Sequence, residues 1–337
     1  MSKRRLKIAI TMGDPAGVGP EIIVKMFLKE DLYKYCDVFV IGDIMPMLSA
    51  QRRITKKIGI KIIGEDLKIV RERNIINLYD IKQVDYSKVI IGEATKEAGF
   101  ASYKYLIKAI DLANSKKIDG IVTAPINKHA LHMAGLKYPG HTEILAKFSK
   151  TKKYAMMLMG DRLKIILVTM HVSLKDVSEK LNIQKIFDKI DITHKSLIKD
   201  FKIKNPRIAV LGLNPHAGEA GAFGREEIEI ITPAIKKAKL KNINVTGPYP
   251  PDTIFHKVVN EKSHDAVICM YHDQGLIPLK LLSFDTGVNV TLGLPFVRTS
   301  PDHGTAYDIA GTGKASCNSI LSALKVACQI AYNRING

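Results

Sequence analysis

The stretch LKIAITMGDPAGVGPEIIVKMFL, residues 6–28, decides the fold class of this 337-residue chain. Its beginning, residues 6–12, is a short apolar run that ends at a glycine, which is typical of a buried strand. Its end, residues 20–28, has apolar residues at helical spacing and a proline in the first turn, where a helix tolerates proline. A strand that passes through a tight turn into a helix predicts an α/β unit with parallel strands.

The same alternation continues outward from this stretch along the rest of the chain, without an internal repeat. We expect further strands at 38–41, 120–122, 165–169, 208–211, 266–270 and 288–292, and further helices at 94–113, 183–199, 226–239 and 316–330. This order of elements predicts α/β architecture with mostly parallel sheets, and the length predicts about two domains.

Polar residues gather directly after several of these strands. They are Gly13-Asp14, residues 123–128, His171, residues 214–218 and His272-Asp273. Ligands of open α/β sheets bind at the carboxyl ends of the strands, so this placement predicts a catalytic crevice there.

The composition excludes several other classes of protein. The net charge is +18, but the basic residues are mostly scattered lysines, and no tract combines arginine with aromatic residues. We therefore attribute the positive charge to lysines on solvated helix faces, where it helps to attract an anionic substrate. We expect no nucleic-acid partner. The four cysteines form no CxxC pair, and no apolar run is long enough to span a membrane, so we expect a cytoplasmic protein without a membrane partner.

The glycine-rich turn at residues 13–21 lies where backbone N–H groups can face an anion. It matches neither GxGxxG nor the P-loop pattern, because the P-loop Lys-Ser/Thr is missing. A phosphate loop and a purely structural turn are both compatible with these residues.

Three histidines follow strand-like segments: His171, His216 and His272. Neutral imidazole is a common ligand of divalent metals, and three histidines from three strand ends could converge on one ion. Their wide spacing has no local signature, so the spacing alone leaves each of them as a structural hydrogen-bonding residue or a ligand.

Two further groups are suited to anions. Lys280, Asn289 and Arg298 stand in apolar surroundings, where a ligand phosphate or carboxylate, or an internal partner such as Asp285 or Asp302, would compensate their burial. In the segment PGHTE, Thr142 is predicted to cap a helix, and His141 just before it could bind an anion at the start of that helix.

Taken together, the motifs resemble the 4-hydroxythreonine-4-phosphate dehydrogenase family of bacterial vitamin B6 synthesis. The resemblance spans residues 8–327 and is carried by ITMGDPAGVGPE, VTAPINK, YPGHTE, LNPHAGE, GPYPPDTIF, YHDQGLIPLK and VNVTLGLPFVRTSPDHGTAYDIAG. The chain departs visibly from the family only in linking segments, notably the lysine-rich residues 54–82.

The resemblance implies a fold similar to isocitrate and isopropylmalate dehydrogenases, with two α/β/α domains and the active site in the cleft between them. We place the first domain at residues 1–130 plus 302–337 and the second at 131–301. The family also implies a homodimer with its active site at the subunit interface.

The resemblance further implies the chemistry. His171, His216 and His272 match metal ligands for Zn, Mg or Co, and the substrate-binding positions match His141, Thr142, Lys280, Asn289 and Arg298. The implied reaction oxidises 4-phosphooxy-L-threonine with NAD or NADP to 2-amino-3-oxo-4-phosphooxybutanoate, which decarboxylates to 3-amino-2-oxopropyl phosphate. Asp252, Asp273 and Lys128 remain equal candidates for the proton acceptor.

Other substrates and reactions stay open at this point. Paralogues oxidise phosphorylated four-carbon sugar acids such as phospho-threonate or phospho-erythronate, or dihydrodiol carboxylates, and the same motifs would serve them. A phosphate acyltransferase of related fold would need neither the metal nor the nicotinamide cofactor. Neither the choice between NAD and NADP nor the metal follows from these residues.

Overall fold

The computed structural model describes residues 4–336, which form two compact units. The first comprises the chain up to Lys152 together with Leu294–Ile335, and the second comprises Lys153–Gly293. Residues 131–152 and 294–301 therefore pack with the first unit, whereas the resemblance led us to place them in the second domain. As a consequence, His141, Thr142 and Arg298 all belong to the first unit.

The first unit is built on a parallel sheet, as the alternation predicted. Its strands lie in the order β3 (Gly59–Ile62), β4 (Ile75–Asp80), β2 (Asp37–Gly42), β1 (Lys7–Thr11), β5 (Gly120–Thr123) and β12 (Val297–Pro301). Each strand is parallel to its neighbours in this order. The sequence predicted β1, β2 and β5, which are fully apolar in their middle, but missed the half-exposed β3, the strand β4, and β12, which carries the polar residues of VRTSP.

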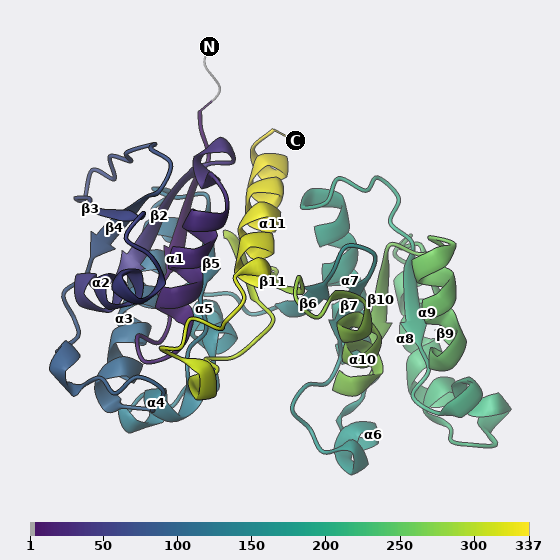
Figure 1. Cartoon of the computed structure of the whole chain (residues 1–337). Coiled ribbons are helices and arrows are strands. Elements are labelled where there is room, and N and C mark those ends of the chain that lie inside the picture. Colours follow the sequence, from purple (N-terminus) through teal and green to yellow (C-terminus); the bar gives the residue numbers. More distant parts are fainter. Residues whose placement is uncertain (1–3, 337) are drawn as a thin grey trace. The chain divides into compact units, whose positions relative to one another are not determined.

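Helices cover both faces of this sheet (Figure 1). The connections from β1 to β2 and from β4 to β5 run in opposite directions across the sheet, and right-handed crossovers then put their helices on opposite faces. The first face carries α1 (Gly19–Lys29), which packs on α2 (Ile44–Ile54) and on α11 (Asn318–Ile335); the second carries α3 (Lys96–Asn114), which packs on α4 (Lys128–Met133) and α5 (His141–Phe148).

The second unit has a mixed sheet. Its strands lie in the order β11 (Val288–Leu292), β6 (Ala155–Met159), β7 (Lys164–Leu167), β10 (Ala266–Cys269), β8 (Ile208–Leu211) and β9 (Val245–Tyr249). The strand β6 runs antiparallel to both of its neighbours, β11 and β7. The four strands from β7 to β9 are parallel, so their carboxyl ends share one edge of the sheet.

Helices also pack on this second sheet. The longest are α7 (Ile183–Lys199), α8 (Thr232–Lys239), α9 (Pro251–Asn260) and α10 (His272–Ser283), and the shortest is α6 (Val177–Lys180). Ile254 and Val258 of α9 and Leu276 and Leu279 of α10 join the strand residues in one buried apolar cluster. The helix predicted at 226–239 consists of a π-helical turn, Glu227–Ile231, that continues into α8.

Four short 3₁₀ turns complete the described elements, namely Leu32–Lys34, Tyr86–Lys88, Leu174–Asp176 and Tyr307–Ile309. A further turn, Pro215–Gly221, contains residues with positive φ. Among residues 4–336, no helix is both long and apolar enough to cross a bilayer.

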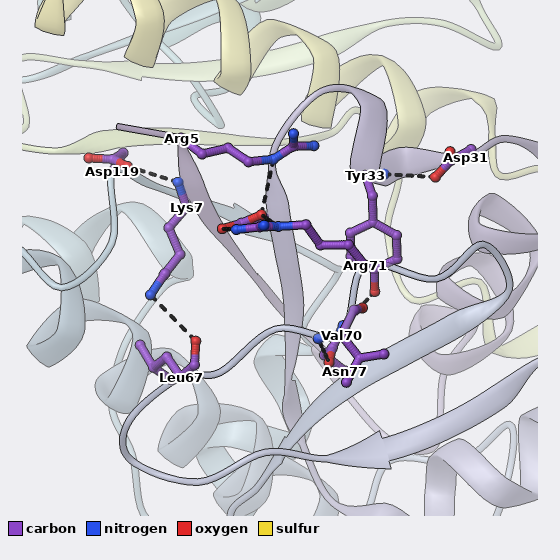
Figure 2. Close-up of polar contacts among 10 residues, drawn as sticks. Arg5, Lys7, Asp31, Tyr33, Leu67, Val70, Arg71, Asn77 and Asp119 are labelled. Atoms are coloured by element: carbon purple, nitrogen blue, oxygen red, sulfur yellow. Dashed lines mark hydrogen bonds and ion pairs between the residues drawn. The ribbon is translucent and has the colours of Figure 1, made fainter. Parts of the chain in front are cut away.

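Polar contacts gather near the amino ends of the strands in the first unit (Figure 2). Asp37, the first residue of β2, accepts two hydrogen bonds from Arg71, at 2.7 and 2.9 Å, and pairs with Arg5 at 3.0 Å. The buried Asn77 accepts from the backbone N–H of Val70 and donates to the Tyr33 hydroxyl. These contacts join Asp37 of β2 and Asn77 of β4 to the segments beside them.

Candidate active site

The three predicted metal ligands lie at the ends of three neighbouring strands of the second unit. His171 follows β7, His272 follows β10 and His216 follows β8. Because β7 is parallel to β10 and β10 is parallel to β8, the three histidines come out at the same edge of the sheet. All three side chains are exposed to solvent.

His171 and His272 form the closest pair of this set. Their ring centroids are 6.0 Å apart, and both rings line a cavity of about 270 Å³ together with Asp273 and Tyr271. His272 Nδ1 lies 2.6 Å from a carboxylate oxygen of Asp273, so Nε2 is the nitrogen left for a ligand. A carboxylate behind a ligating imidazole is the usual way in which a protein orients such a ring.

His216 stands apart from this pair in the structure. Its ring packs against Phe223, with centroids 6.3 Å apart, and it does not line the cavity of the other two histidines. Within residues 4–336, no three His, Cys, Asp or Glu side chains are gathered closely enough to hold a metal ion. Imidazole nitrogens are common ligands of divalent cations, so the residue types at this edge fit such an ion. Of the three imidazoles, His171 and His272 lie close to each other, and His216 lies apart from them.

The backbone at this edge is strained. His171 has φ 44° and His216 has φ 52°, both in the left-handed region that residues with a side chain rarely adopt. Such conformations persist only where the surrounding structure imposes them, and they concentrate at functional sites.

Arg298 forms a buried cationic site in the first unit. It lies on β12 next to β5 and is 2% exposed, and one of its terminal nitrogens donates to the Thr123 hydroxyl at 2.7 Å. Burial lowers the pKa of Arg298 to about 9, and the negative charge of Glu143 partly opposes this shift. The guanidinium is therefore still charged at neutral pH, and it is suited to a phosphate or carboxylate.

His141 belongs to the same cluster as Arg298. It is the first residue of α5, whose cap residue is Gly140, so the prediction of Thr142 as the helix cap is wrong. Gly140 is fully extended, and the helix therefore begins earlier than the Thr-Glu pair suggested, with Thr142 buried inside its first turn. Burial, and secondarily the charge of Arg298, lowers the pKa of His141 well below its usual value, so the imidazole is neutral.

The other two predicted substrate residues lie in the second unit. Lys280 is on α10, with its Nζ 5.5 Å from the centroid of the Phe284 ring. Asn289 is on β11, and its Oδ1 is buried without a hydrogen-bond partner among the described residues. The structure thus groups His141 and Arg298 in one unit, and Lys280, Asn289 and the three histidines in the other.

The glycine-rich turn after β1 is a structural turn in this protein. The N–H groups of Asp14, Gly17 and Val18 donate to backbone carbonyls of the first unit, and that of Ala16 donates to the Asp14 carboxylate. They are therefore not directed at a ligand phosphate. A side chain at Gly13 would lie 2.3 Å from the Pro125 carbonyl oxygen, which explains the glycine by close packing.

Asp14, in this turn, is a titratable group to which the sequence analysis gave no role. It is fully buried and accepts hydrogen bonds from the Tyr307 hydroxyl at 2.7 Å and from the Ala16 N–H at 2.8 Å. Desolvation raises its pKa to about 6, although both hydrogen bonds act in the opposite direction. In the sequence, a role for Asp14 was indicated by its position directly after a predicted strand.

The three candidate proton acceptors are all exposed. Asp252 lies in the first turn of α9, Asp273 stands beside His272, and Lys128 is the first residue of α4. None of them lies in a buried environment that would single it out.

Two α/β units with polar residues at the carboxyl ends of parallel strands define a two-domain α/β enzyme. The chain belongs to the family described as pyridoxal phosphate biosynthetic protein PdxA, whose model matches residues 34–327. This confirms the family resemblance of the motifs and makes the chain a dehydrogenase.

Similar proteins cover the chain from end to end. The 4-hydroxythreonine-4-phosphate dehydrogenase of Desulforapulum autotrophicum is 45% identical over 340 residues, which are 100% of both chains. The D-threonate 4-phosphate dehydrogenase of Pectobacterium atrosepticum is 44% identical over 325 residues, 96% of this chain and 99% of the relative. The crystal structure of 4-hydroxythreonine-4-phosphate dehydrogenase from Klebsiella pneumoniae superposes with a TM-score of 0.89 at 43% identity and covers 98% of this chain and 99% of that one.

Proposed function

We propose that this protein oxidises 4-phosphooxy-L-threonine with NAD or NADP to 2-amino-3-oxo-4-phosphooxybutanoate, which loses carbon dioxide to give 3-amino-2-oxopropyl phosphate. The observation that carries this proposal is the buried cluster of Arg298, His141 and Thr123 in the first unit. A charged guanidinium beside a neutral imidazole can bind the phosphate or the carboxylate of a phosphorylated amino acid. Lys280 and Asn289 would hold the remaining polar groups of the substrate.

The three histidines at the edge of the second sheet would hold the divalent cation. Zn, Mg and Co are the candidate ions, and a bound ion would supply positive charge beside the substrate alcohol. Asp273 would keep the His272 ring in place through Nδ1. The nicotinamide cofactor would accept the hydride, and one of Asp252, Asp273 and Lys128 would receive the proton.

A homodimer is the proposed assembly, and α10 supports it. Ile277 and Leu281 of this helix and Phe284, its C-cap residue, follow each other at helical spacing and are 67%, 86% and 75% exposed. Exposed apolar stripes of this kind mark protein–protein interfaces. The same helix begins at His272 and carries Lys280, so a partner bound there would lie next to the proposed site.

The dimer is tested by changing this stripe. We expect Leu281→Glu to convert the protein to a monomer in analytical ultracentrifugation. The control is Leu240→Glu, at the 87% exposed residue directly after α8, which should leave the mass unchanged. A dimer that persists in Leu281→Glu would show that α10 is not part of the interface.

A cytoplasmic location without nucleic-acid or membrane partners remains a prediction from the composition.

The runner-up substrate is D-threonate 4-phosphate, because a relative with that name is about as similar to the chain as those named for 4-hydroxythreonine-4-phosphate. The two substrates differ by an amine in place of a hydroxyl. The experiment is a comparison of kcat/KM for both compounds, each with NAD and NADP, followed by nicotinamide absorbance. A higher kcat/KM for the threonate would overturn the proposed substrate.

The metal site is tested in the same assay. His216→Ala and His272→Ala should lose both bound metal and turnover, and His256→Ala is the matched control because its side chain is 72% exposed on α9. Wild-type turnover and metal content in either of the first two variants would show that the three-histidine site is wrong.

A further inference from the structure

The loop that carries His216 has an unusual backbone. The five residues from His216 to Ala220 have φ values of 52°, 54°, 82°, 41° and 55°, which is a short run of left-handed conformation. Four of the five have side chains, and left-handed geometry brings each of their Cβ atoms too close to the following carbonyl. An isolated chain would leave this conformation, so contacts outside the loop must hold it in place.

Glu227, in the neighbouring segment, contacts the chain on both sides of His216. Its side chain is buried, with 3% of the residue exposed. One carboxylate oxygen accepts hydrogen bonds from the backbone N–H groups of Leu213 and Asn214, at 2.7 and 2.8 Å. The other oxygen accepts from the Asn214 side-chain amide at 3.0 Å. The carboxylate thus fixes the position of the segment between β8 and His216 through three hydrogen bonds.

The loop is also shaped to receive this carboxylate. A Cβ added at Gly212 would lie 3.0 Å from one oxygen of Glu227, and a Cβ added at Gly218 would lie 2.5 Å from the other. Two glycines, one on each side of His216 in sequence, therefore let the loop fold closely around the carboxylate. Glu227 itself is the first residue of the π-helical turn Glu227–Ile231, a form that is rare and often occurs at functional sites.

We propose that Glu227 is a positioning residue for His216, which holds the left-handed loop so that this imidazole is presented to the cation. The inference rests on the proposed function, since it assumes that His216 is a metal ligand. The chemistry is suitable, because charge-assisted hydrogen bonds are the stronger ones. They hold the carboxylate against Leu213 and Asn214 on one side of His216, and the same carboxylate packs against Gly218 on the other side.

The test measures metal binding rather than turnover. Apo protein is titrated with cobalt(II) chloride, and the dissociation constant is read from calorimetry and from the visible absorbance of the ion. We expect Glu227→Leu to bind cobalt about 10- to 100-fold more weakly, the range for residues behind metal ligands. Glu227→Gln keeps an oxygen for the two backbone N–H groups and should restore most of the affinity.

The matched control is Glu229→Leu. Glu229 belongs to the same π-helical turn, but its side chain is 58% exposed and pairs only with Arg225 among the contacts described here. It removes the same charge without touching the loop, so the cobalt affinity should stay within about twofold of wild type. A folded Glu227→Leu variant with wild-type cobalt affinity overturns the proposal.

Two further arms keep the result decisive. If His216→Ala binds cobalt as tightly as wild type, His216 is not a metal ligand and the proposed metal site is wrong. If His216→Ala loses affinity but Glu227→Leu does not, the metal site stands and only the proposed role of Glu227 is wrong. If Glu227→Leu does not fold, hydrogen exchange is measured on the wild-type protein. The amides of Leu213 and Asn214 should exchange more slowly when cobalt is bound, and unchanged exchange contradicts the coupling.

Discussion

The two ends of the parallel sheet in the first unit use polar residues in opposite ways. At the amino ends of the strands, Arg5 and Arg71 (Figure 2) pair with the buried carboxylate of Asp37. The side chains of these two arginines are 40% and 56% exposed. Toward the carboxyl ends, Asp14 follows β1, and the guanidinium of Arg298 reaches Thr123, the last residue of β5. Both Asp14 and Arg298 are almost completely buried. Burial there lowers the pKa of Arg298 to about 9 and raises that of Asp14 to about 6.

This difference separates structure from function within a single sheet. A charged group that keeps its water and has a partner contributes little beyond local stability. A charged group that has lost its water is destabilising by itself, and a bound ligand can compensate it. Because every strand of the sheet points the same way, the costly groups collect at one end, where ligands of α/β proteins bind.

The largest effect is expected for Arg298→Ala, because this guanidinium contacts Thr123 at the carboxyl end of β5. Removing the buried guanidinium should lower kcat/KM for 4-phosphooxy-L-threonine about 100-fold, which corresponds to about 3 kcal/mol of transition-state stabilisation. Steady-state kinetics with the nicotinamide cofactor measure this loss. Arg71→Ala at the amino ends is the matched control and should keep wild-type kcat/KM; equal losses in both variants would break the distinction between the two ends.

Asp14→Asn should reveal the energetic penalty of the buried carboxylate. Its pKa of about 6 lies above the value of 3.8 expected when unfolded, so the folded protein binds the proton more tightly, and stability falls as pH rises from about 4 to about 6. Two pKa units correspond to about 3 kcal/mol. Asparagine can still accept from Ala16 and donate to Tyr307, without the charge.

The measurement is the melting temperature of both proteins at pH values on either side of that window. Relative to wild type, the Asp14→Asn variant should gain stability as pH rises through it. A difference between the two proteins that does not change with pH would mean that Asp14 is not destabilised by burial.

Asn77→Ala sharpens the comparison from the amino ends. Asn77 is fully buried and hydrogen-bonds to both backbone groups of Val70 and to the Tyr33 hydroxyl. Its loss leaves these groups unsatisfied and should lower the free energy of unfolding by about 2 kcal/mol. Denaturant unfolding measures this change, while kcat/KM should remain at the wild-type value; a drop in kcat/KM of the folded variant would contradict a purely structural role.

The smallest effect is expected for Arg71→Ala on stability. Its side chain is 56% exposed, and Asp37 keeps its contact with Arg5 at 3.0 Å. We expect the melting temperature to change by less than about 2 °C. Calorimetry at low and high salt measures it, and a large change that is insensitive to salt would show that this ion pair is not an exposed one.

The sequence was sufficient for the alternating pattern of strands and helices. The strands β8 and β11 and the helix α7 begin and end where their apolar patterns do, because their buried residues are continuous or regularly spaced. The strand β12 was missed because Arg298, Thr299 and Ser300 read as polar, although all three are buried in the structure. A pattern of hydrophobicity cannot identify a strand whose buried side chains are polar.

The candidate site divides in the same manner. By its residues and motifs, the sequence determined the family, and it identified His171, His216, His272, His141 and Arg298 as candidates. Only the tertiary structure decided that β7, β10 and β8 are parallel neighbours, that Thr123 holds Arg298, and that Glu227 lies under the His216 loop. The physical reason is that residue type sets which chemistry a side chain can perform, whereas strand order and burial set which side chains meet and how much water they lose.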